Sequence, residues 1–198
     1  MLDRIFAPDR TPELIRGDLL LRAARPGDYQ QWRDVRLKSH AFLKPYEPRW
    51  SEVDLSPAVF RERLRRNRRE AEAGTEFSFL IFRTGPEGDV LNGGLTLSNI
   101  RRRAALHANL GYWMGVDSAG KGIMSEAVNM ILPFVFSHLD LKRLHAATLP
   151  GNMASRRVLE KNGFREEGYA EDYLQIDGTW QDHVLYGLTR RHHEGRRA

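Results

Sequence analysis

Residues 111–128 have the sequence GYWMGVDSAGKGIMSEAV. The first six residues are rich in aromatic and apolar side chains, which is typical of a strand, and a run of small residues and glycines follows. Apolar residues then recur at helical spacing from Ile123 to about His138, with Pro133 expected to kink the helix. The stretch therefore predicts a strand, a glycine loop and a helix in direct succession.

The glycine loop has the chemistry of an anion site. A helix start offers unpaired backbone N–H groups and a partial positive charge, and glycines let an anion approach that backbone closely. Gly120 and Gly122 provide the access, and Lys121 adds a cation. The loop lacks the GxxxxGK-Ser/Thr and GxGxxG patterns of common nucleotide sites. It therefore predicts a pyrophosphate site of another kind, with a simply capped helix as the alternative.

Upstream of this stretch, the pattern predicts one strand and two helices. Residues 18–24 are expected to form the strand, and Asp28 is expected to cap the first helix. Residues 42–50, which contain two prolines, are expected to form a stiff loop. The second helix should begin at the Ser56 cap and end at Gly74.

The remaining segments predict an antiparallel sheet whose strands come both before and after the long helix in the sequence. Strands are expected at 76–83, 90–100, 106–116 and 142–149, and a short helix should open at Asn152 and close at Gly163. Two last strands should flank an Asp177-Gly178 turn. The whole pattern predicts an α+β fold around one mixed, mostly antiparallel sheet.

Length and composition favour a single domain. The chain has 198 residues, 41% of them hydrophobic, and we expect an arm at 1–17, one domain at 18–190 and a frayed basic tail at 191–198. No apolar run is long enough for a membrane span, and the arm lacks the apolar centre of a signal peptide. The absence of cysteine excludes disulfides, thiolate zinc sites and cysteine nucleophiles, and fits a cytoplasmic location. The histidines show no HxxxH pair, so no metal site is expected.

The charge balance is basic and rests on arginine. The formal net charge is +5, and arginines gather at 61–69, 101–103 and 190–197. Such clusters attract phosphates, either of a nucleotide or of a ribosome or other RNA. Glutamates interleave with the first cluster, which is equally typical of a solvated helix face.

Three segments carry a resemblance to a known family. Residues 119–124 are similar to the Gln/Arg-x-x-Gly-x-Gly/Ala motif of the GCN5-related N-acetyltransferases (GNAT), with Ala119 at its first position, Gly122 at its first glycine and Met124 at its last position. Residues 149–188, LPGNMASRRVLEKNGFREEGYAEDYLQIDGTWQDHVLYGL, are far more specific and resemble the ribosomal-protein alanine N-acetyltransferase branch, especially in the N-x-x-S pattern that begins at Asn152.

Residues 42–48 (FLKPYEP) match the same branch, and the resemblance spans about 18–190. It implies the GNAT fold, in which a sheet with helices on both faces splays into a V. Acetyl-CoA would lie between the strand ending at Val116 and the strand starting near Lys142. The residues implied in holding it are Trp113, Met114, Val116, Gly120, Lys121, Gly122, Ile123, Met124, Ser125 and Asn152.

The resemblance also implies direct attack of a neutral amine on the thioester, with Ser155 near the sulfur as proton donor. The carboxylate and the tyrosine that often serve the family as base and acid are replaced by Asn109 and Leu159. These departures favour proton removal through water. Glu47 is the candidate for orienting the amine, or else a surface glutamate.

Asn99, Tyr173 and His183 are candidates for binding the acceptor, although a turn asparagine and a hydrogen-bonded structural histidine are the ordinary alternatives. The leading functional hypothesis is acetylation of a protein N-terminal α-amine, such as the alanine of a ribosomal protein, by a monomer or homodimer. The alternatives are a small-molecule amine acetyltransferase, for an antibiotic or polyamine, and a basic ribosome- or RNA-binding factor without strong catalysis.

Overall fold

A computed structural model describes residues 11–196 and contains one eight-stranded sheet. The strand order is β1-β2-β3-β4-β5-β6-β8-β7, and every neighbouring pair is antiparallel except β5 and β6. The strands are β1 (Leu14–Arg16), β2 (Leu19–Arg22), β3 (Phe77–Arg83), β4 (Val90–Arg101), β5 (His107–Met114), β6 (Arg143–Thr148), β7 (Arg165–Ile176) and β8 (Thr179–Thr189). The expected mixed, mostly antiparallel sheet is confirmed.

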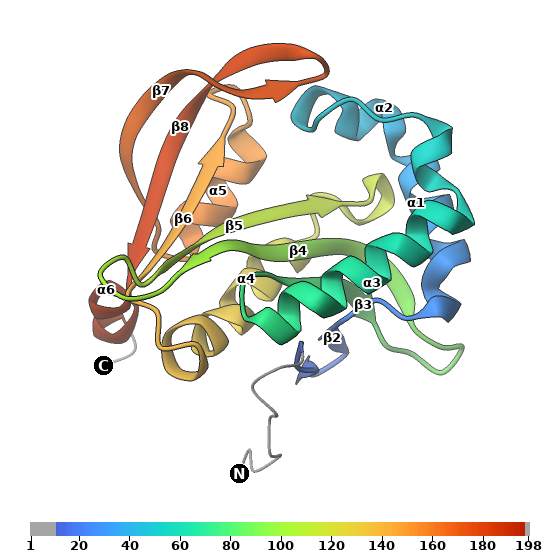
Figure 1. Cartoon of the computed structure of the whole chain (residues 1–198), viewed down its shortest axis with the longest axis horizontal. Coiled ribbons are helices and arrows are strands. Elements are labelled where there is room, and N and C mark those ends of the chain that lie inside the picture. Colours follow the sequence, from blue (N-terminus) through green and yellow to red (C-terminus); the bar gives the residue numbers. More distant parts are fainter. Residues whose placement is uncertain (1–10, 197–198) are drawn as a thin grey trace.

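Helices cover both faces of the sheet (Figure 1). They are α1 (Tyr29–Lys38), α2 (His40–Leu43), α3 (Pro57–Ala73), α4 (Ile123–Pro133), α5 (Met153–Lys161) and α6 (Arg190–Gly195). One core lies under α4 and joins all the central strands, while a smaller aromatic core with Trp32, Phe60 and Phe82 lies under α1 and α3. No helix within the described residues is long and apolar enough to cross a membrane.

Several local predictions agree with the structure. The Ser56 hydroxyl accepts the Val59 N–H at the start of α3, and Gly74 ends that helix with a left-handed φ of 67°. The long helix changes at Pro133, after which residues 134–138 form a π-helical turn. The turn between β7 and β8 lies at Asp177 and Gly178, both with positive φ, as a tight hairpin requires.

Other local predictions are wrong. The Asp28 side chain does not cap α1, because its carboxylate is taken by the buried guanidinium of Arg22, at 2.7 and 2.8 Å, and by the Arg25 N–H. Residues 42–50 are partly helical, since α2 and a 3-10 turn at Lys44–Tyr46 occupy their first half.

The chain ends are also more ordered than expected. Residues 14–16, which we expected in the N-terminal arm, form β1 at the edge of the sheet, and residues 1–10 lie outside the described part. The expected frayed tail is α6 as far as Gly195, because Thr189 caps it and His193 is buried against Phe136. The last two residues lie outside the described part.

The sheet splays where its only parallel pair separates. β5 and β6 pair solely over residues 107–109 and 143–145, yet β5 runs on to Met114 and β6 to Thr148. Beyond Asn109, the edge of β5 that faces β6 has no strand partner within the described residues. Figure 1 shows the two strands diverging, with the β7–β8 hairpin leaning away on the β6 side. The V-shaped gap is the feature that the rest of the site is built around.

Candidate active site

A cavity of about 490 Å³ fills the gap between the diverging strands. β5 and β6 form its walls, the start of α5 forms one end, and the β7–β8 hairpin with the loop after α2 closes over it. The lining residues are Tyr46, Pro48, Leu110, Gly111, Tyr112, Ala146, Ala147, Thr148, Leu149, Asn152, Ser155, Leu174, Gln175, Ile176 and His183. Three of the residues predicted from the sequence, Asn152, Ser155 and His183, therefore meet in this cavity.

Ser155 lies in the first turn of α5, where two neighbours hold it. The Asn152 side-chain oxygen accepts the Ser155 N–H at 3.1 Å, which makes Asn152 the helix cap. The Ser155 hydroxyl oxygen lies 2.8 Å from the Tyr112 hydroxyl oxygen. Burial raises the pKa of Tyr112 to about 12, so the phenol stays protonated at neutral pH. The pair is a neutral proton-donor unit at the wall of the cavity.

The glycine loop has the open backbone that an anion needs. Gly120 and Gly122 have φ of 75° and 79°, and a Cβ at either position would meet no atom within 4 Å. The first hydrogen bond of α4 runs from the Glu126 N–H to the Gly122 carbonyl at 3.1 Å. The amides of residues 123–125 precede that bond and have no partner within the helix. This cradle fits the diphosphate of coenzyme A.

The side chains around this cradle have separate roles. Those of Ile123 and Met124 are 4% and 7% exposed and pack in the main core, so only their backbone can face a ligand. Lys121 is exposed beside the loop. The carbonyl of Ser125 accepts the Asn162 side-chain amide at 3.1 Å and ties α4 to the end of α5.

The β5 residues expected to hold acetyl-CoA, together with Val116, differ in which of their atoms face the gap. The edge of β5 through Trp113 and Met114 is open toward the gap. The Val116 N–H instead donates to the buried Ser39 hydroxyl at 3.0 Å. The Trp113 ring packs with the Arg36 guanidinium 5.0 Å from its centroid, on the face covered by α1 and α3. The structure thus leaves the backbone of β5, rather than these side chains, to face the gap.

The carboxylate of Glu47 is fully engaged. It accepts two hydrogen bonds from Arg36, at 2.9 and 2.8 Å, and a further one from the Trp50 ring N–H. Its backbone carbonyl accepts the Asp177 N–H at 3.0 Å, which ties this loop to the hairpin turn. In this arrangement Glu47 fastens the loop that brings Tyr46 and Pro48 to the cavity, and Glu47 itself is not among the residues that line it.

Of the three predicted acceptor-binding residues, two lie together and the third lies apart. His183 is 3% exposed, and its Nδ1 lies 2.9 Å from the Gln181 carbonyl, while its ring centroid lies 5.5 Å from that of the half-exposed Tyr173. Asn99 sits at a bulge of β4 with φ of 50° and lines a different hollow, together with Arg66 and Arg101. The structure therefore brings His183 to the cavity, with Tyr173 behind it, and leaves Asn99 outside.

Sequence reasoning missed part of the lining. Tyr112, Tyr46, Gln175 and Ile176 line the cavity, although none of them is among the residues predicted above. Strand alternation is the signal that places Tyr112 on the α5 side of β5. The described lining holds no Asp, Glu or Lys, so the cavity offers no carboxylate as a base. Within residues 11–196, no three His, Asp or Glu side chains gather as a metal site.

A sheet split beside a glycine loop, with a hydroxyl pair in the split, defines a transferase that takes its acyl group from coenzyme A. Residues 18–165 match the family model described as an acetyltransferase (GNAT) domain, and the chain belongs to this family. It is an N-acetyltransferase of the GNAT fold, and acetyl-CoA is its co-substrate.

Its relatives include ribosomal-protein acetyltransferases. The chain is 34% identical over 171 residues, 86% of this chain and 87% of the relative, to the [Ribosomal protein uS5]-alanine N-acetyltransferase of Escherichia coli. It is 39% identical over 128 residues, 65% of this chain and 70% of the relative, to the probable N-acetyltransferase YjcK of Bacillus subtilis. The solved structure of Mycobacterium smegmatis RimJ in complex with CoA-disulfide superposes with a TM-score of 0.83 at 33% identity, covering 93% of this chain and 89% of that one.

Proposed function

We propose that this enzyme acetylates the N-terminal α-amine of a protein, with alanine as the first residue and a ribosomal protein as the acceptor. The observation that carries the proposal is the cavity lining without a carboxylate. At pH 7 about a tenth of α-amino groups are neutral, against about one in 2,500 lysine amines. An α-amine therefore needs little help from a base in a site whose described lining holds no carboxylate, whereas a lysine amine would need a strong base.

The chemistry is a direct transfer. The neutral amine attacks the thioester carbon, the bond from carbon to sulfur breaks, and the new amide nitrogen loses its extra proton to water. The coenzyme A thiolate takes a proton from the Ser155 hydroxyl, which Tyr112 supports from 2.8 Å. Ser155 then regains a proton from the water that accepted the one from the amine, so the enzyme ends the cycle unchanged. No covalent enzyme intermediate is needed, in agreement with a chain that has no cysteine.

The cavity argues against the polyamine alternative, because a polycation needs acidic side chains that the described lining lacks. The names of the relatives support a ribosomal protein as acceptor. Such an acceptor is present where ribosomes are made and work, and on this ground we propose a cytoplasmic location.

The test uses acetyl-CoA and short peptides that differ only in their first residue. Release of free thiol gives the rate, and mass spectrometry locates the acetyl group. We expect the peptide that begins with alanine to react fastest, and an N-terminally blocked peptide containing lysine to remain unmodified. Faster acetylation of the blocked peptide, or of spermidine, would reject the proposal. Protein that binds RNA but turns over no peptide would instead favour the RNA-binding alternative.

A further inference from the structure

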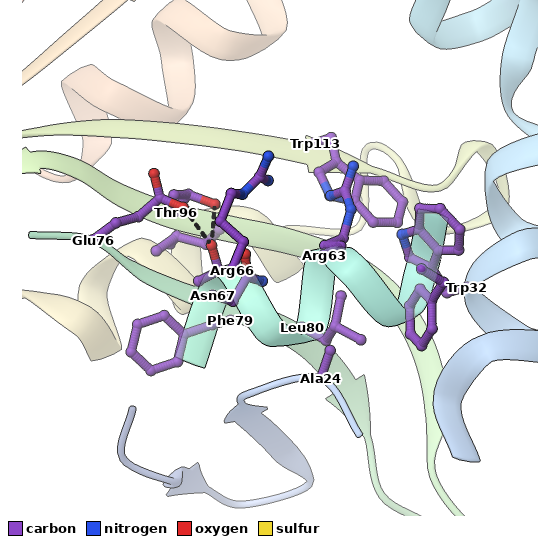
Figure 2. Close-up of a pocket in the computed structure, with 13 residues that line it drawn as sticks. Ala24, Trp32, Arg63, Arg66, Asn67, Glu76, Phe79, Leu80, Thr96 and Trp113 are labelled. Atoms are coloured by element: carbon purple, nitrogen blue, oxygen red, sulfur yellow. Dashed lines mark hydrogen bonds between the residues drawn. The ribbon is translucent and has the colours of Figure 1, made fainter. Parts of the chain in front are cut away.

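A second pocket, of about 240 Å³, lies on the face of the sheet that α1 and α3 cover (Figure 2). α3 forms one side of it, and β3, β4 and the Trp113 ring of β5 form the other. Its polar lining consists of Arg63, Arg66, Asn67, Glu76, Ser78 and Thr96. It is separate from the cavity that holds Ser155, and none of the roles above involves it.

The described lining of the pocket holds two arginines and a single carboxylate. Figure 2 shows Arg63 beside Trp113, and Arg66 nearer to Thr96, both extending from α3 on the side of β5. Within residues 11–196 neither guanidinium forms an ion pair, whereas three other arginines of α3 pair with glutamates of the same helix. Arg63 lies among further cations, since desolvation and then the charges of Arg66 and Arg36 lower its pKa.

Two further groups in the pocket are hydrogen-bond acceptors. The side-chain oxygen of Asn67 is buried and has no hydrogen-bond partner within the described residues. The Glu76 carboxylate, which accepts the Ser78 hydroxyl at 3.2 Å, is the one carboxylate in the described lining. The pocket can therefore take a carboxylate on its arginines and a backbone N–H on Asn67.

A path leads from this pocket to the active-site cavity. Ser78, Thr96 and Gly111 are cross-strand partners on β3, β4 and β5, so they lie in a row on one face of the sheet. A Cβ at Gly111 would meet no atom within 4 Å, and Gly111 itself lines the cavity. The missing side chain leaves the end of the row open, and an extended chain can lie across it.

We propose that this pocket is a subsite that binds an acidic side chain of the acceptor polypeptide, with Arg63 and Arg66 as its ligands. The inference rests on the proposed function and names the acceptor more closely. Ser78 lies two strand spacings from Gly111, about 10 Å, which an extended chain covers in about three residues. With its amine in the gap, the acceptor places its third or fourth residue at the arginines. An acceptor with Asp or Glu there is the preferred one.

The test compares peptides beginning with alanine that carry Glu, Gln or Lys at the third or fourth position. We expect kcat/KM for the Glu peptide to exceed that for the Gln peptide about tenfold, because only the Glu peptide places a charged acceptor at the arginine hydrogen bonds. Arg66→Gln should bring this ratio close to one, and Arg66→Glu should favour the Lys peptide. Arg65→Gln removes the same charge from an exposed position paired with Glu62, so it should keep the wild-type ratio.

A peptide-binding measurement tests this inference independently of the proposed function. Titration of the same peptides into the protein loaded with coenzyme A, followed by tryptophan fluorescence, reports the pocket even without turnover, because Trp32 and Trp113 line it. Tighter binding of the Glu peptide, lost in Arg66→Gln, supports the subsite even if no acetyl group moves. Equal binding and equal rates for all three peptides would overturn it, as would a preference that Arg66→Glu leaves unchanged. Displacement of the Glu peptide by a short RNA but not by a second acidic peptide would assign the pocket to nucleic acid.

Discussion

The hydroxyl oxygens of Tyr112 and Ser155 lie 2.8 Å apart, although one residue belongs to β5 and the other to α5. The Tyr112 oxygen also lies 3.3 Å from the Ser155 carbonyl. With its pKa raised to about 12 by burial, Tyr112 remains a donor at neutral pH. When Tyr112 donates to the Ser155 hydroxyl oxygen, the serine hydrogen is free to point into the gap. The tyrosine thus positions the proton that Ser155 gives to the leaving thiolate.

Removal of this pair should slow turnover and leave cofactor affinity unchanged. We expect Ser155→Ala to lower kcat about a hundredfold, as loss of a proton donor does. Tyr112→Phe should lower it about tenfold, and the double variant should match Ser155→Ala alone, because the tyrosine acts through the serine. Thiol release gives kcat and calorimetry gives the Kd of coenzyme A.

Tyr29→Phe is the control for this pair, since it removes a hydroxyl that donates to the Leu55 carbonyl away from the cavity. It should keep wild-type kcat. If the losses in kcat caused by Ser155→Ala and Tyr112→Phe multiply in full in the double variant, Tyr112 and Ser155 act independently.

A side chain at the glycine loop should block cofactor binding. Gly122→Val places a branched side chain at a left-handed φ of 79°, directly before the amides that start α4. We expect the Kd of coenzyme A to rise at least about tenfold, with some loss of stability from backbone strain, on the order of 1–2 kcal/mol. Calorimetric titration measures the first effect and urea unfolding the second.

Gly74→Val controls for the strain, because Gly74 has a similar φ of 67° at the far end of α3 and its Cβ space is equally empty. It should lose comparable stability and bind coenzyme A normally. If Gly122→Val also binds coenzyme A normally, the diphosphate does not bind at this loop.

Substitution of Glu47 tests whether this residue has a structural or a catalytic role. Because Arg36 and Trp50 occupy its carboxylate, we expect Glu47→Gln to lower kcat/KM for the peptide less than about tenfold and to lower the free energy of unfolding. A group that orients or deprotonates the amine contributes about a hundredfold or more. Steady-state rates with the alanine peptide separate the two cases, and a hundredfold loss with unchanged stability would restore Glu47 as a catalytic candidate.

His145 should make the fold sensitive to acid. It is the last residue of β6 paired with β5, and its Nε2 is buried without a hydrogen-bond partner in the described part of the chain. Desolvation, Arg143 and His107 lower its pKa. As pH falls through about 6.5, the unfolded chain takes up a proton that the folded chain does not, so the free energy of unfolding decreases. Urea unfolding between about pH 7.5 and 5.5 should show this loss, and His145→Gln should reduce it. An equal loss in both proteins would exclude His145 as the cause.

Much of the fold follows from local pattern. The order of strands and helices, the Ser56 and Asn152 caps, the break at Pro133 and the Asp177 turn all depend on neighbours a few residues apart, which the sequence displays directly. The prediction that Asp28 caps α1 was wrong because it left out Arg22. The buried guanidinium of Arg22 binds the Asp28 carboxylate, which is therefore not available to the end of the helix. The tail helix likewise depended on a distant core that buries His193.

The sequence by itself determined the family and the class of reaction, because these rest on contiguous motifs. It also predicted the glycine loop as the site of the diphosphate. Only the tertiary structure decided that Tyr112 meets Ser155, that Arg36 binds Glu47, that Asn99 lies outside the gap and that Arg63 and Arg66 line a second pocket. The physical reason is that these relations join residues from separate elements. They exist only after the sheet has set its register and the helices have packed on its two faces.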